Sequence, residues 1–496
     1  MRLPQAPVNS CKALEIAKSR ATTHLSIGSP WPAHHTARRI GCPPALRTAL
    51  LAALMLALLA ALAGRVAAEA PIPATAEQDG ALLVLAAGDL RGEIKPCGCS
   101  PEGQMGGLPR RLSYLERQLG AHAPRPILVD VGNNFPLPSA QGRLKIDLIQ
   151  KLLGRYAPEA LLPGPNELAM GVGTLDRNLP YLISNDGLAT IFRRYRTVRR
   201  GQRRIGLYGY LSPATVYQGS QSHFRLQPAD AELIAALRET LARERHTAAV
   251  LLFRGSDEEL ARFVRAGLFD LIVAGNTSAD EMNQVTERIV AGVRIPQVPT
   301  KGQGVLRMKL PAPGQALMAR AQVDWLKDEW PDHPDAAPVF QAYDEQVKEL
   351  FFARLETMKH QQRQSPFAGA VPCKTCHTAA ARVWAGSRHA HALATLERVG
   401  KQYDPECLAC HVVGLERGGF LSQDLTPRLA NVQCENCHGP AKTHAGNPGV
   451  KPGPVPSADG QPLRRPAEPT CRTCHVGSHS PRFSYPVYWP KVRHGS

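Results

Sequence analysis

Long apolar runs are absent from the last quarter of this 496-residue chain. Beyond Pro366 the sequence is rich in Cys, His, Gly and Pro, and this composition excludes a core built from side chains in the ordinary way. Cysteine is also scarce outside this segment. Eight of the twelve cysteines lie within it, and the other four are Cys11, Cys42, Cys97 and Cys99.

The eight C-terminal cysteines form four Cys-x-x-Cys-His pentads. Two thiols three positions apart on a helical turn can each add to a haem vinyl group, while the next residue's imidazole reaches the iron. One pentad alone can be half of a zinc site, but four with every histidine present predict four c-type haems. The predicted attachment cysteines are Cys373, Cys376, Cys407, Cys410, Cys434, Cys437, Cys471 and Cys474. The predicted axial ligands are His377, His411, His438 and His475. Four such macrocycles would supply the missing core.

Acidic residues are the minority charge, with 42 against 59 Lys and Arg. Beyond Ala68 the numbers are 41 and 51, and haem propionates would reduce the positive balance further. We therefore expect no nucleic-acid partner. The net positive charge fits electrostatic steering toward an acidic redox partner or an anionic surface. The alternative is that the basic residues only form a solvated surface and have no role in binding partners.

One uncharged apolar stretch, residues 49–64, follows Arg38, Arg39 and Arg47 and precedes Val66-Ala67-Ala68. This pattern predicts an export signal with a long lead over residues 1–68, cleaved after Ala68, and hence a periplasmic protein. The stretch is short for a membrane span, so an uncleaved anchor with membrane association is the alternative. Haem attachment outside the cytoplasm agrees with export.

The segment 366–496 resembles the tetrahaem cytochrome c-554 family of electron carriers. The resemblance runs over residues 367–479, through the first three pentads, Trp384 to His391, Gly418-Gly419-Phe420 and Asn431 to Pro440. It implies a mostly helical package of closely stacked haems. In this family most irons are held by two histidines, and one iron can lack a second protein ligand.

Second axial ligands require histidines outside the pentads. His389 and His444 match family positions for such ligands, and His391 and His479 are further candidates. His494 is an alternative to His479 after the last pentad, in a tail that we expect to be mobile. If one iron stays open, we expect it to be that of His411. Electron transfer is the main interpretation, with nitrogen-oxide type reduction at an open haem as the alternative.

The N-terminal half predicts an α/β layered domain over residues 80–310. Expected strands are 81–87, 126–129, 248–253 and 268–274, and expected helices are 141–153 and 230–244. The order resembles the 5′-nucleotidase and calcineurin-like metallophosphoesterase fold. The stretches that carry the resemblance include Gly88 to Gly92, Leu128 to Asn133, Gly164 to Glu167 and Ile272 to Ser278.

That family binds two metals, yet the matching loops here have lost most of the ligands. Asp89 remains, but the Asp-x-His motif reads Asp89-Leu90-Arg91, and Asn133 stands at the bridging Asp. The other motifs read Gly164-Pro165-Asn166-Glu167 and Gly275-Asn276-Thr277-Ser278, and Arg254 replaces a histidine. One carboxylate cannot hold a dinuclear site, so we expect no phosphoesterase activity. Arg91 and Arg254 are either anion-binding or plain structural replacements.

Two further segments complete the prediction. The alternatives for Cys97-Gly98-Cys99 are a redox pair, a metal pair, a contact with a partner, or free thiols or a structural bridge with no further role. Residues 311–365 form a linker, with a helix over 337–362 that packs the two domains together or lies on one alone. The expected architecture is thus an α/β layered metallophosphoesterase-like domain followed by a mostly α, haem-packed cytochrome domain.

Overall fold

The computed structural model describes most of the chain beyond residue 80. The described ranges are 81–96, 105–188, 191–216, 224–277, 285–312, 321–477, 479–480 and 482–495. The expected export signal over residues 1–68 lies outside them, as do Cys97, Cys99 and Ser278. No helix of the described ranges is both long and apolar enough to cross a bilayer.

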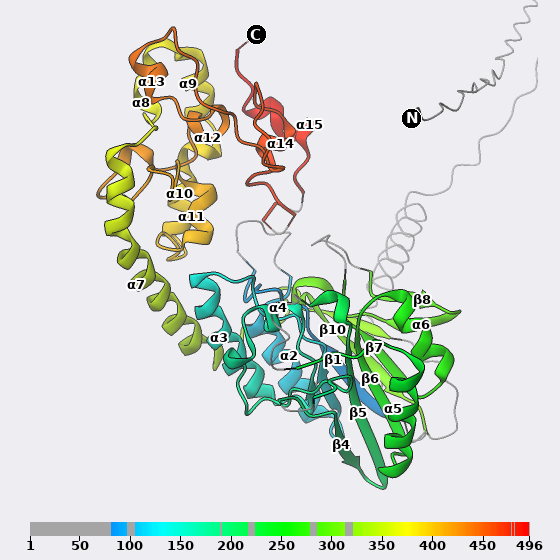
Figure 1. The fold of residues 1–496 in the computed structure, drawn as a ribbon. Coiled ribbons are helices and arrows are strands. Elements are labelled where there is room, and N and C mark those ends of the chain that lie inside the picture. The colour runs from blue at the N-terminus through cyan, green and yellow to red at the C-terminus, as the bar shows by residue number, and fades with distance from the viewer. Residues whose placement is uncertain are drawn as a thin grey trace, which may run out of the picture. The chain divides into compact units, whose positions relative to one another are not determined.

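The first sheet has five strands in the order β11-β10-β1-β2-β3. Within it β10 lies beside β1 (Figure 1). The strands are β1 (Leu82–Ala87), β2 (Ile127–Asp130), β3 (Ala160–Leu161), β10 (Gly304–Leu310) and β11 (Gln322–Trp325). Strands β1, β2 and β3 are parallel, whereas β10 is antiparallel to β1. The apolar run of β1 is almost wholly buried, as expected for a central strand covered on both faces. Because β1 and β2 end side by side, the loops that follow them meet at one edge.

The second sheet has four strands in the order β4-β5-β6-β7. They are β4 (Tyr195–Arg200), β5 (Arg203–Leu211), β6 (Ala248–Arg254) and β7 (Leu271–Ala274). Along β6, Val250 and Leu252 belong to the core shared with the first sheet, while Leu251 and Phe253 belong to a second core. This alternation places the two sheets face to face. A separate hairpin pairs β8 (Glu287–Val290) with β9 (Val293–Pro296).

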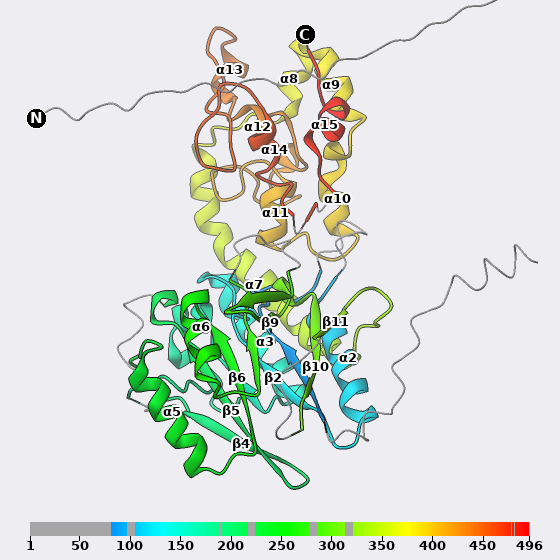
Figure 2. The same ribbon diagram turned by 90° about the vertical axis from the view of Figure 1, so that its right-hand side faces the viewer.

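Helices cover the outer faces of both sheets (Figure 2). Helices α2 (Leu108–Ala121) and α3 (Ala140–Tyr156) contribute to the core of the first sheet, with short α4 (Pro165–Ala169) nearby. Helices α5 (Ala231–Arg243) and α6 (Asp257–Ala266) pack on the second. Side-chain caps begin α3, α5 and α6, since Ser139, Asp230 and Ser256 each accept a hydrogen bond from a backbone N–H of the first turn.

The expected α/β layered architecture is confirmed, as are the strands and helices named from the sequence. The boundaries differ at α3, which begins one residue earlier and ends three residues later than expected, and at β7, which begins at Leu271 and not at residue 268. Asp270 ends the preceding turn, where its carboxylate accepts a hydrogen bond from the backbone N–H of Ala249. The turn therefore takes residues that apolar content alone assigned to the strand.

Helix α7 (Ala336–Arg363) joins the two halves of the protein. Its residues Tyr343 and Val347 lie in the core of the first sheet, whereas Phe351 lies in a separate small core of the C-terminal segment. The expectation that this helix packs against both domains is confirmed. Pro338 lies in its first turn, where the missing N–H breaks no helical hydrogen bond.

Beyond α7 the chain forms short helices and loops. They are α8 (Ala370–Cys376), α9 (Thr378–Ala385), α10 (Ala392–Glu397), α11 (Pro405–His411), α12 (Cys434–His438), α13 (Lys442–Gly446), α14 (Glu468–Cys471) and α15 (Tyr485–Tyr488). The described core here is small, centred on Phe367, Leu408 and Phe420. This agrees with a segment whose side chains alone supply little core.

Candidate functional site

Each pentad begins on one short turn of helix. The first lies on α8, the second on α11, the third on α12, and the fourth on α14 with the turn that follows it. Within each turn the histidine N–H is held by the carbonyl of the first cysteine, as in His377 to Cys373 and His475 to Cys471. This geometry directs the two thiols and the imidazole of a pentad toward one side.

The structure places three pentad histidines beside a second histidine from elsewhere in the chain. The ring centres of His377 and His444 are 6.2 Å apart, those of His475 and His389 are 6.1 Å apart, and those of His438 and His494 are 5.7 Å apart. In every pair the partners are distant in sequence. Loop folding, and not local helix geometry, brings them together.

These separations fit an iron held between two imidazoles. A metal–imidazole bond is roughly 2 Å long, so two rings bound through Nε2 on opposite faces of one iron have centres roughly 6 Å apart. The three observed pairs match that separation. The residues present therefore fit c-type haem at these positions, with thiols for attachment and imidazoles for the axial sites.

The other ring nitrogen is engaged in several of these histidines. Nδ1 of His444 lies 2.7 Å from the carbonyl of Val450, and Nδ1 of His494 lies 2.8 Å from the carbonyl of Val492. A carbonyl accepts only, so the proton is on Nδ1 and Nε2 keeps its lone pair for a metal. Burial also lowers the pKa of His475 to about 4, so this ring stays neutral.

His411 differs from the other three pentad histidines. Its Nδ1 donates to the carbonyl of Ala392 at 2.7 Å and lies 3.3 Å from the hydroxyl of Thr395. Among the described residues, no second histidine ring contacts His411. The pKa of His389 is lowered mainly by the burial of His389 and to a smaller extent by the charge of His411. His391 and His479, two other candidate ligands, are exposed.

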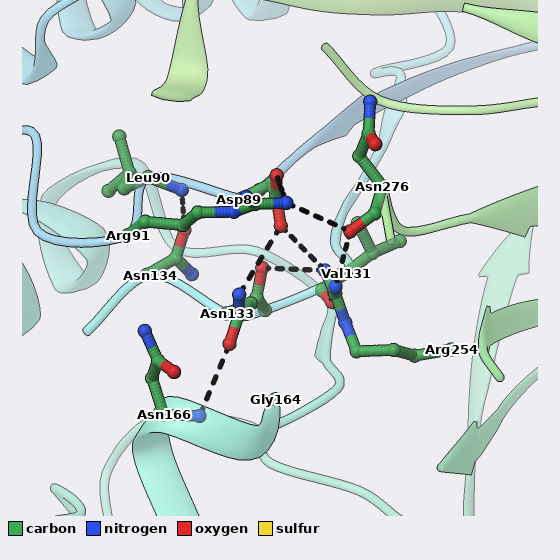
Figure 3. A network of polar contacts seen from close by, with 12 residues as sticks. Asp89, Leu90, Arg91, Val131, Asn133, Asn134, Gly164, Asn166, Arg254 and Asn276 are labelled. Carbon is green, nitrogen blue, oxygen red and sulfur yellow. Dashed lines mark hydrogen bonds and ion pairs between the residues drawn. The ribbon is translucent and has the colours of Figure 1, made fainter. Parts of the chain in front are cut away.

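In the α/β domain, the loops that follow β1, β2, β6 and β7 converge on Asp89 (Figure 3). Arg254, at the end of β6, donates through Nη2 to Asp89 Oδ1 at 3.2 Å, and Arg91 lies 3.0 Å from Oδ2. Asp89 is fully buried, and the Arg254 side chain is 3% exposed. The buried carboxylate of Asp89 is therefore paired with two guanidinium groups.

Arg254 is held by more than this carboxylate. It also donates to the carbonyls of Val131 and Gly132 at 3.2 Å and to the carbonyl of Asn276 at 2.9 Å. The amide of Asn133 reaches Asp89 at 3.5 Å. Burial raises the pKa of Asp89, while Arg254 and then Arg91 oppose the rise. A buried carboxylate with a raised pKa needs these cations to remain ionised.

No group of three or more His, Cys, Asp or Glu in the described ranges is placed to hold a metal ion. Asn166 and Glu167 lie in α4, which follows β3. The backbone N–H of Asn166 donates to Asn133, and Glu167 accepts hydrogen bonds from the backbone N–H groups of Asn134 and Gly164. These side chains hold the loops to one another.

The C-terminal segment is similar to known cytochromes. Residues 372–439 match the cytochrome c554 and c-prime family. The chain is also 33% identical over 99 residues to the cytochrome c-554 of Nitrosomonas europaea, covering 17% of this chain and 42% of that one. The chain thus spans less than half the length of this relative. The resemblance expected from the pentads is confirmed, and residues 366–495 are called the cytochrome segment below.

The structure is also similar to solved phosphoesterases. They include a 5′-nucleotidase precursor from Thermus thermophilus, with 20% identity, a TM-score of 0.45, and coverage of 54% of this chain and 59% of that one. The calcineurin-like phosphoesterase YfkN from Bacillus subtilis has 13% identity, a TM-score of 0.43, and coverage of 54% and 97%. Similarity at this level supports no statement about the activity of this chain.

Within the cytochrome segment the pentads lie in two neighbouring pairs. A hydrogen bond from the Cys373 side chain lowers the pKa of Cys434 to about 7, and one with Cys410 lowers that of Cys474 to about 7. The first pentad therefore adjoins the third, and the second adjoins the fourth. Asn436 connects the two groups by donating to the carbonyl of Val412 at 2.9 Å.

Some residues of the cytochrome segment matter more than their sequence pattern indicates. His494 is one, because a position near the chain end gives no sign of a fixed partner. Gln433 and Glu435 are two others. Both are buried and bond to the backbone before α8, so their role depends on contacts that no local pattern contains.

Proposed function

We propose that this protein is an exported, periplasmic cytochrome that carries electrons through four covalently attached c-type haems. The α/β domain serves as a scaffold or docking module without phosphoesterase activity. Donor and acceptor are redox proteins that meet the cytochrome segment, and the excess of basic residues fits acidic partners.

The observation that carries the proposal is the set of three histidine pairs with ring centres 5.7–6.2 Å apart. A haem held by such a histidine pair would supply one-electron chemistry, and the two imidazole ligands would leave no site for a substrate at the iron. The chain's own contribution is to fix each ring. The carbonyls of Val450 and Val492 orient His444 and His494, and the short helices hold the pentads.

The neighbouring pentads support a route for electrons. Cys373 and Cys434 approach closely enough for a hydrogen bond, as do Cys410 and Cys474. Groups attached at such cysteines lie close together. The contact of Asn436 with Val412 then joins one pair to the other within a single segment.

For the α/β domain, the arrangement around Asp89 supports a non-catalytic role. Hydrolysis by two metals requires several ligands that converge on cations. Here Arg254 and Arg91 fill that space and neutralise the one remaining carboxylate. The domain also contacts the second pentad, since Gln141 of α3 donates to Asp404 at 2.8 Å, and Asp404 caps α11.

A second candidate function is reduction of a small nitrogen oxide at one open haem. It is favoured by His411, whose ring is fixed by Ala392 while no second histidine ring pairs with it in the described ranges. An iron with one protein ligand has a free coordination site. The two candidates therefore differ in a measurable property of the second pentad.

The test is the EPR spectrum of the oxidised, haem-loaded full chain, with a carbon monoxide titration of the reduced protein. Electron transfer alone predicts only low-spin signals and no carbon monoxide bound. An open haem predicts one high-spin signal and one carbon monoxide per chain, and nitrogen-oxide turnover would then decide between the two functions. Fewer than four haems per chain by mass would refute the tetrahaem proposal.

Two variants in the tail sharpen this test. His494→Ala should open the iron of the third pentad and add one carbon monoxide per chain, because its ring faces His438 at 5.7 Å. His479→Ala, a change of the same kind 15 residues earlier, should leave the stoichiometry unchanged. The reverse result would assign His479 as the ligand.

A further inference from the structure

Glu435 is a buried carboxylate inside the third pentad. It is 2% exposed. Its two oxygens accept hydrogen bonds from three backbone N–H groups, those of Ala368 at 2.9 Å, Gly369 at 2.8 Å and Ala441 at 2.8 Å. No ion pair to Glu435 occurs in the part of the chain that the structure describes.

The three donors belong to the elements that carry the first pentad and its paired histidine. Gly369 is the N-cap of α8, which holds Cys373 and Cys376. Ala441 is the N-cap of α13, which holds His444, and that ring lies 6.2 Å from His377. Glu435 thus ties the first pentad, its paired histidine and the third pentad to one carboxylate.

The negative charge of Glu435 acts on the thiols of both pentads. The pKa of Cys373 is raised by its hydrogen bond with Cys434 and by burial, and the charge of Glu435 raises it further. At Cys434 the hydrogen bond from Cys373 lowers the pKa, while burial and the charge of Glu435 oppose the change. The thiols become thioethers when haem is attached, so these shifts show only that the charge of Glu435 acts at the attachment points of both pentads.

A buried carboxylate disfavours an electron added nearby, because both carry negative charge. Charge near a haem is one of the factors that set its reduction potential. Burial matters here, since water and salt screen a buried charge far less than an exposed one. Backbone N–H groups stabilise the carboxylate but leave its net charge in place.

We propose that Glu435 is a fixed buried anion that lowers the reduction potentials of the two haems held by the first and third pentads. This inference rests on the proposed function, since it requires haem at both pentads. The haems of the first and third pentads would then have the lower reduction potentials of the four. The haems of the second and fourth pentads then form the high-potential end, which favours electron flow from the first group to the second.

The test is a spectropotentiometric titration of the haem-loaded full chain, wild type against Glu435→Gln. Two of the four reduction steps should move to higher potential while the other two stay in place. Glu468→Gln is the matched control. Glu468 precedes the fourth pentad but is 43% exposed and pairs with Arg472, so its loss should leave all four steps unchanged. No shift in Glu435→Gln, or an equal shift in the control, would overturn the proposal.

A second variant covers the case in which Glu435→Gln does not load haem. Glu435→Asp keeps the charge but is too short to reach all three N–H groups. If the charge sets the potentials, this variant keeps them close to wild type, whereas a purely structural role predicts displaced potentials. A wild-type titration without four one-electron steps would refute the proposed function itself, whatever the variants show.

Discussion

Replacing Arg254 by Met is the sharpest perturbation of the α/β domain. The change removes a guanidinium whose side chain is 3% exposed, together with its contact to Asp89 and to three carbonyls. Asp89 is left fully buried with Arg91 as its remaining cation. Removing one partner of a buried ion pair costs about 3–5 kcal/mol, so we expect a loss of this size in the free energy of unfolding.

The partner variants separate charge from packing. Asp89→Asn alone leaves Arg254 without its carboxylate and should also destabilise the domain. The double variant removes both charges, and we expect it to be more stable than the sum of the single losses, with a coupling of at least about 1 kcal/mol. Arg294→Met is the control, because this residue is 72% exposed and its pair should contribute at most about 1 kcal/mol.

The pH dependence has a definite sign. Burial raises the pKa of Asp89 in the folded protein above its value in the unfolded chain. The stability that Asp89 contributes is therefore fully present at pH values below the unfolded pKa and is lost as the pH rises through the folded pKa. Arg254 opposes this rise, so Arg254→Met moves the folded pKa higher still. The variant should therefore lose less stability at pH 5 than at pH 8.

The assay is urea-dependent hydrogen exchange of the haem-loaded chain, read by mass spectrometry in peptides of β1 and β6. These strands flank the site and report the opening of this domain separately from the cytochrome segment. Additive losses in the double variant would refute the view that Arg254 acts by neutralising Asp89. A cost for Arg254→Met no larger than that of Arg294→Met would do the same.

Two other predictions use the same exchange assay. Gln141→Ala removes the hydrogen bond to Asp404 and should cost about 1.5–3 kcal/mol, with faster exchange across α11, whereas Gln150→Ala on the same helix should leave α11 unchanged. Gly132→Ala should cost more than Gly201→Ala, although both have a positive φ. An added Cβ at Gly132 would lie 1.8 Å from the carbonyl oxygen of Leu162, while at Gly201 it meets nothing within 4 Å. Equal costs in either comparison would contradict the structure.

The sequence predicted the features that are local. Apolar runs and helical spacing located β1, β6, α3 and α7, because each is defined by neighbours in the chain. The pentads are local as well, so the attachment cysteines were found from spacing alone. Their assignment as haem sites remains a prediction of the chemistry.

The sequence could not predict how distant residues meet. Nothing near His494 distinguishes it from His479, and its position beside His438 depends on the path of the whole tail. The same holds for Arg254. The loss of a histidine was visible, but the contacts of its guanidinium with carbonyls after β2 and β7 arise only when the strands align.

The backbone around Asp89 indicates why an α/β domain with so few metal ligands keeps this form. Asp89, Arg91 and Asn133 all have a positive φ, of 54°, 49° and 57°. Such conformations cost energy and persist only where the surroundings enforce them. Backbone hydrogen bonds supply part of this enforcement, from Asp89 N–H to the Gly132 carbonyl at 2.7 Å and from Arg91 N–H to the Asn133 carbonyl at 2.9 Å. Arg254 adds to it by bonding to the carboxylate of Asp89 and to carbonyls of the loops after β2 and β7. A bound cation would hold the same converging oxygens. The Arg254 guanidinium thus holds these loops together by hydrogen bonds, in the same domain whose helix α3 bonds through Gln141 to Asp404, the N-cap of the helix of the second pentad.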